Sequence, residues 1–85
     1  MCTYVTTTAP VGGSAYGGAD WFAVNRAVVY FDHPQDAALD HALCIDVWGT
    51  GDRVAVELDA ASARALAQAI LTTLDSDEVA ALLVE

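Results

Sequence analysis

The sequence contains no lysine and only three arginines, Arg26, Arg53 and Arg64, against twelve acidic residues. The formal net charge of −9 repels the phosphates of nucleic acids and the headgroups of anionic lipids. We therefore expect neither nucleic acid nor a membrane surface among the partners of this protein.

Long hydrophobic runs are also missing. No apolar stretch approaches the ~20 residues that a membrane-spanning helix needs, and the N-terminal residues contain neither a basic nor a hydrophobic export segment. Two cysteines, Cys2 and Cys44, are too few for a disulfide framework. These features predict a cytoplasmic protein whose cysteines are free thiols.

The common catalytic and cofactor motifs are absent as well. The glycine pairs at 12–13 and 17–18 lack the lysine of a phosphate-binding loop, and no HExxH, CxxC, nucleophile elbow or dinucleotide fingerprint occurs. Hydride transfer, phosphoryl transfer and zinc-protease chemistry therefore have no support in the sequence.

What the chain does contain is apolar residues, which make up 55% of its 85 positions and predict a single domain over residues 1–85. Alternation of side chains and turn chemistry predict the β-structure. We expect an edge strand at 2–9 that Pro10 ends, a glycine-rich loop at 11–20, a strand at 21–32, and a hairpin of 41–48 and 53–59 joined by GTGD.

A helix follows the predicted hairpin. Asp59 is a suitable N-cap, and apolar residues then recur at helical spacing at Ala63, Leu66, Ala67, Ile70, Leu71 and Leu74. A last short helix at 77–84 is expected after a cap at Asp75 or Ser76. The predicted fold is α+β, an antiparallel sheet of about four strands with the long helix packed on one face and a short final helix.

Pairing across the GTGD turn separates the two faces of the hairpin. Its aliphatic face carries Leu43, Ile45, Val47, Val54, Val56 and Leu58, and its reverse face carries Cys44, Asp46, Trp48, Arg53, Ala55 and Glu57. Arg26, Tyr30 and Asp32 share one face of the preceding strand, and alternation alone leaves open which one.

The reverse face combines aromatic, arginine and carboxylate side chains. Such mixtures are typical both of protein interfaces and of small-ligand pockets. We take Tyr30, Trp48, Arg53 and Glu57 as candidate ligand-binding residues. The alternative is a homodimer formed through this face or through an edge of the sheet.

His33 and His41 flank the loop HPQDAALDH and could approach each other if their strands are neighbours. As candidate catalytic residues, His33, His41 and Asp46 would support proton transfer. The carboxylate of Asp32 or Asp46 would orient an imidazole while Arg53 holds an anionic oxygen. With Asp32, Asp36 or Asp40, the same histidines could instead bind a divalent metal, although H-x7-H matches no standard zinc signature. The third reading makes both histidines exposed turn residues.

The segments MCTY, GSAYGGADWF, VVYFDHP, HALCID and RVAVELDAASARALAQAI together resemble a family of small uncharacterised actinobacterial proteins. The resemblance covers nearly the whole chain. It implies a bacterial source and a place among natural-product biosynthesis genes, and it transfers no catalytic residues, because the family has no established activity.

These observations lead to one expectation and two alternatives. The expectation is a bacterial protein that binds a small molecule, with isomerase, dehydratase or cyclase chemistry as its catalytic form and no cofactor. The alternatives are an acidic homodimeric interaction module without catalysis, and a divalent-metal-binding protein that uses His33 and His41.

Overall fold

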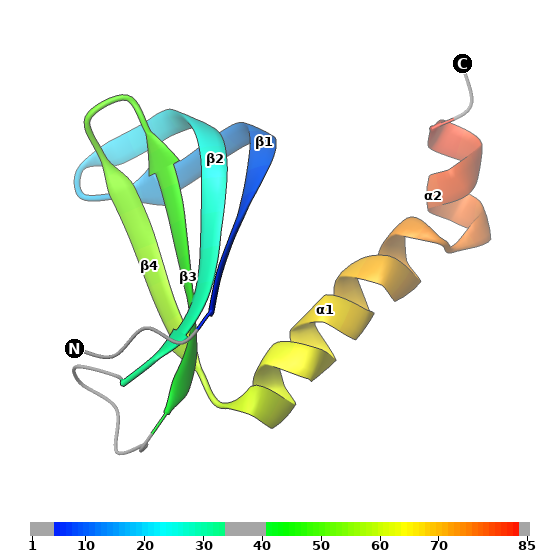
Figure 1. Ribbon diagram of the computed structural model, residues 1–85. Helices are drawn as coiled ribbons and strands as arrows, with labels where there is room; N and C mark the ends of the chain where they lie inside the picture. Colours follow the sequence, from blue (N-terminus) through cyan, green and yellow to red (C-terminus); the bar gives the residue numbers. More distant parts are fainter. Residues whose placement is uncertain (1–4, 34–40, 84–85) are drawn as a thin grey trace.

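The structure, a computed structural model, describes residues 5–33 and 41–83 of the chain. It is an α+β fold, as predicted (Figure 1). Four antiparallel strands in the order β1-β2-β3-β4 form one sheet, and two helices follow them. The elements are β1 (Val5–Gly17), β2 (Asp20–Asp32), β3 (Ala42–Gly49), β4 (Arg53–Leu58), α1 (Ala60–Leu74) and α2 (Asp77–Leu82).

The first strand is longer than predicted. Pro10 does not end it, and the glycine-rich segment expected to be a loop continues the strand to Gly17. Both errors have one cause: β1 is an edge strand with a bulge between Pro10 and Gly13, and edge strands and bulges tolerate proline and glycine. The turn to β2 is confined to Gly18, whose φ of 61° suits glycine, and Ala19.

The sheet curls so that the end of β1 approaches β4. A Cβ placed on Gly17 would lie 3.0 Å from Cγ2 of Val54. Glycine in a strand commonly marks such a close approach.

The predicted hairpin is confirmed residue by residue. Trp48 pairs with Arg53 across the turn, and the pairs continue to Leu43 with Leu58. The register of β2 with β3 also answers the question that alternation left open. Arg26 pairs with Trp48 and Tyr30 with Cys44, so the polar residues of β2 join the reverse face.

Helix α1 begins and ends where the sequence predicts. The Asp59 carboxylate accepts a hydrogen bond from the backbone N–H of Ser62 at 2.7 Å, and Ser76 caps α2 by accepting from the N–H of Val79. Helix α2 is shorter than expected, ending at Leu82.

Helix α1 does not lie flat on the sheet along its whole length. It starts beside the aliphatic face and then diverges, so that α2 lies well away from the sheet (Figure 1). No residue of α1 is buried. The radius of gyration is 14.8 Å, whereas a compact domain of this length has about 12 Å.

No helix within residues 5–33 and 41–83 has both the length and the apolar character needed to cross a membrane.

Candidate functional site

The reverse face of the sheet carries a cluster centred on Trp48. The guanidinium carbon of Arg26 lies 4.9 Å from the centroid of the Trp48 ring, and that of Arg53 lies 5.4 Å from it. Two of the three cations in the sequence therefore contact one indole, in the geometry of cation–π interactions. Beside them, an open groove is lined by Trp48, Gly49, Gly51, Asp52 and Arg53.

Asp46 connects this cluster to the middle of the sheet. Its Oδ2 accepts a hydrogen bond from Nη1 of Arg53 at 3.1 Å and another from the hydroxyl of Tyr30 at 3.2 Å. Its Oδ1 is buried and has no hydrogen-bond partner among the described residues. The carboxylate is thus held between β2 and β4 by two donors, with one acceptor atom left unsatisfied.

The two neighbouring titratable groups keep their protons at neutral pH. Burial, and then the charge of Asp46 and its hydrogen bond, raise the pKa of Tyr30 to about 12. Burial and nearby carboxylates, first that of Glu57, raise the pKa of the Cys44 thiol. Tyr30 is therefore a hydrogen-bond donor, and Cys44 is a buried thiol rather than a nucleophile.

The reverse face also holds the most buried residues of the described chain. Asp32, Ala42, Cys44 and Asp46 are all at most 7% exposed. This is unexpected, because the aliphatic face was predicted to form the core beneath the helix. The small side chains of the central strand are flanked by larger ones on both neighbours, as Cys44 is by Tyr30 and Glu57.

The histidines lie elsewhere. The rings of His33 and His41 stack at 5.0 Å between centroids, and the His41 ring stacks on Phe31 at 5.7 Å. Phe31 belongs to the aliphatic face, so both histidines are on the opposite side of the sheet from Asp46. They are also at the opposite end of the sheet from Trp48: six positions of β3 separate Ala42 from Trp48, about 20 Å of strand.

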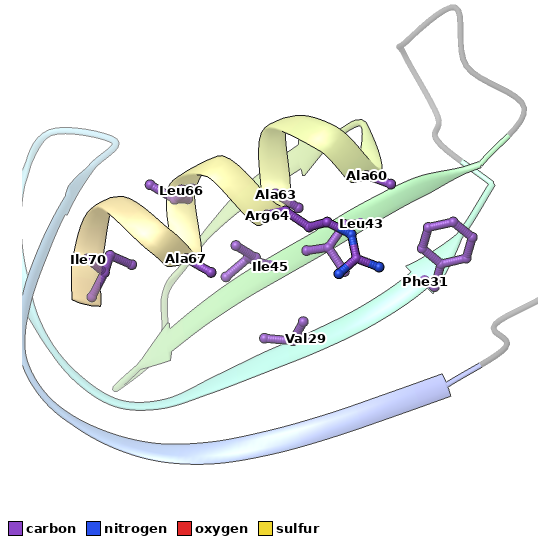
Figure 2. Close-up of a pocket in the computed structure, with 10 residues that line it drawn as sticks. All are labelled: Val29, Phe31, Leu43, Ile45, Ala60, Ala63, Arg64, Leu66, Ala67 and Ile70. Carbon is purple, nitrogen blue, oxygen red and sulfur yellow. The ribbon is translucent and has the colours of Figure 1, made fainter. Parts of the chain in front are cut away.

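The aliphatic face and α1 enclose a cleft of about 450 Å³ (Figure 2). The sheet contributes apolar side chains from β2 and β3, and the helix contributes mainly alanine, leucine and isoleucine. The lining residues are Val29, Phe31, Leu43, Ile45, Ala60, Ala63, Arg64, Leu66, Ala67 and Ile70. Arg64 is the one charged residue among them, and its side chain extends between Leu43 and Phe31 in Figure 2.

The structure therefore divides the residues predicted as one site. It brings Tyr30, Asp46, Trp48, Arg53 and Glu57 onto one face, and it places His33 and His41 beside the cleft on the other. Among the described residues, no three histidine, cysteine, aspartate or glutamate side chains are arranged to hold a metal ion. Asp36 and Asp40, two of the proposed third ligands, lie outside the described residues, as does Cys2.

Sequence reasoning missed Arg64 as a candidate. Its spacing could have revealed it, because Arg64 is one turn after Ala60 and three residues before Ala67, at the edge of the apolar stripe. Arg64 was omitted because only the apolar residues of the helix were considered as its packing face.

Comparison with known proteins identifies the family and leaves its activity open. A family of unknown function (DUF6295) matches residues 1–83, so the chain belongs to that family. No curated protein and no solved structure matches the chain. A function must therefore be inferred from the geometry and chemistry of the site.

Proposed function

We propose that the protein binds a small molecule with an apolar body and an anionic group, such as a carboxylate, in the cleft between α1 and the aliphatic face. The observation that carries the proposal is the lining of this cleft, which is apolar except for Arg64. A volume of about 450 Å³ lies within the range of ligand pockets, and apolar walls with few polar groups are typical of them.

Arg64 supplies the polar contact that would orient the ligand. No carboxylate among the described residues forms an ion pair with it, whereas Arg53 is paired with Asp46. A guanidinium presents a fork of N–H donors that fits a carboxylate, and Arg64 is exposed, so these donors are open to a ligand that enters the cleft. An anionic group at Arg64 would direct the rest of the ligand along Leu43, Ile45 and Ile70.

The histidines extend this site at one end. Since His41 stacks on Phe31 and Phe31 lines the cleft, an imidazole lies next to the bound ligand in this proposal. The proposal keeps the proton-transfer chemistry that the sequence predicts. In a catalytic protein of this kind, His33 and His41 would exchange protons with the bound ligand. Asp46, Trp48 and Arg53 face away from the cleft and stabilise the sheet in this scheme. The bacterial and biosynthetic context stays a prediction.

The experiment uses two probes of equal shape, 2-naphthoate and its neutral amide, with binding followed by isothermal titration calorimetry. Arg64→Met keeps most of the aliphatic stem and removes the charge. We expect it to weaken naphthoate about tenfold, the scale of one charge-assisted contact of about 1.4 kcal/mol, and to leave the amide unchanged. Ala67→Phe fills the cleft and should abolish binding of both probes.

Arg26→Met is the matched control, because it removes one positive charge from the reverse face. It should leave both affinities unchanged. The proposal is wrong if neither probe binds the wild-type protein, or if Arg26→Met weakens naphthoate as much as Arg64→Met does.

A further inference from the structure

The last five residues of α1 and the whole of α2 form a projecting helical arm, comprising residues 70–74 and 77–82 with the following Leu83. Its large apolar side chains are exposed: Ile70 by 52%, Leu71 by 55%, Leu74 by 47%, Leu82 by 82% and Leu83 by 62%. Monomeric proteins rarely expose apolar side chains in such a contiguous group. Ile70 still borders the cleft, but beyond it the sheet covers neither the end of α1 nor α2, because the helices have diverged from the sheet (Figure 1).

We infer that a second copy of this chain covers the arm, through a two-fold symmetric contact of arm with arm. Such a contact uses the same surface on both copies. The surface must therefore carry projecting side chains and also a groove that receives the side chains of the other copy. The arm offers both. A shallow groove lined by Ala69, Ile70, Thr73 and Leu74 lies along α1, and the exposed Leu71 lies beside it.

Charge restricts where a second copy can bind. Each chain carries a net charge of −9, so two copies repel each other over most of their surfaces. The 15 residues of α1 include no acidic side chain, and Arg64 is the one charged residue in the helix. The contact is therefore centred on α1, where two strongly acidic chains can approach without opposing carboxylates, and Asp77 and Glu78 in the first turn of α2 lie at its edge.

The area available is enough for a specific dimer. At roughly 100 Å² of apolar surface for each of the five exposed side chains of the arm, the contact would bury about 500 Å² on each copy and about 1,000 Å² in total. This is about the smallest area expected of a specific interface. It would also account for a radius of gyration above that of a compact monomer.

The test is native mass spectrometry and light scattering of the full chain at 10–100 µM, in buffer of moderate ionic strength. We expect a wild-type mass of twice the 8.9 kDa chain. The double variant Leu71→Glu/Leu74→Glu should dissociate, with a dimer dissociation constant at least ~100-fold higher, because four carboxylates would enter the contact. Neither leucine lines the ligand cleft, so this result and naphthoate binding can fail independently.

The matched control is Tyr16→Glu/Trp21→Glu, which places the same two charges on residues that are 60% and 62% exposed at the far end of the sheet. It should remain dimeric. A mixture of the Glu variant with Leu71→Lys/Leu74→Lys should form a heterodimer, which a misfolded arm would not do. A monomeric wild type, a Glu variant that stays dimeric, or a control that dissociates would each overturn the inference.

Discussion

Gly49 is the position where the structure makes its sharpest prediction about stability. A Cβ at this site would overlap the carbonyl oxygen of Ala23 and lie 2.7 Å from Cδ2 of Phe22. Both obstacles belong to β2, immediately before the bulge between Val24 and Arg26. Because the main obstacle is backbone, a side-chain rotation cannot remove it, and the two strands must separate locally.

The expected loss in the free energy of unfolding follows from that separation of the strands. Moving β3 away from β2 near Gly49 weakens one or two ladder hydrogen bonds, at about 1 kcal/mol each, and adds the strain of overpacking, at about 1–3 kcal/mol. We expect Gly49→Ala to lower the free energy of unfolding by about 3 kcal/mol. For a domain of this length, that corresponds to a fall in melting temperature of about 12–24 °C, measured by circular dichroism.

Gly12→Ala is the control for this substitution. A Cβ on Gly12 meets nothing within 4 Å, and its φ is not in the left-handed region. The same change should therefore be neutral or stabilising by up to ~1 kcal/mol, since alanine restricts the unfolded chain. Equal melting temperatures for the two variants would refute the close approach of β3 to β2.

Three further predictions concern titratable groups. Because the pKa of Tyr30 is raised from 10.0 to about 12, stability should fall as pH rises from 10 towards 12, and Tyr30→Phe should remove both this loss and the late phenolate absorbance. Cys44 should resist iodoacetamide in the native protein and react after denaturation, as peptide mass spectrometry would show; rapid native labelling would contradict its burial. Hydrogen bonds from Ser62 lower the pKa of Asp59, so its capping should stabilise above the usual aspartate pKa of 3.8. Asp59→Ala should reduce the melting temperature by a few degrees at pH 7, and this difference should vanish as the pH falls below that value.

The sequence predicts the hairpin and the helix well because their signals are local. GTGD fixes which residues pair, and the caps at Asp59 and Ser76 fix where the helices begin. The error at Pro10 has a different origin. Proline ends a strand only where its missing N–H would be needed, and the edge position predicted for this strand already allowed Pro10 to stand inside it.

The candidate site was harder to predict than the fold, because it depends on which face and which end of the sheet each residue occupies. Alternation grouped Asp46, Trp48 and Arg53 correctly. Alternation along β2 and β3 also places His33 with Phe31 and His41 with Leu43 on the aliphatic face, so grouping the histidines with Asp46 overlooked a signal that the sequence contains. The angle at which α1 leaves the sheet, which creates the cleft, has no local signal at all.

The arginines and the acidic residues are distributed unevenly over this protein. All three arginines are at the surfaces described above, two on Trp48 and one at the cleft, although acids outnumber them four to one in the sequence. The acids, in turn, are absent from α1, the element that closes the cleft and begins the arm. If α1 were simply a solvent-exposed helix, nothing would exclude acidic side chains from it, and in so acidic a chain they would improve its solubility. Their absence is what we expect of a helix that contacts an apolar ligand over residues 60–70 and a second copy over its last turn.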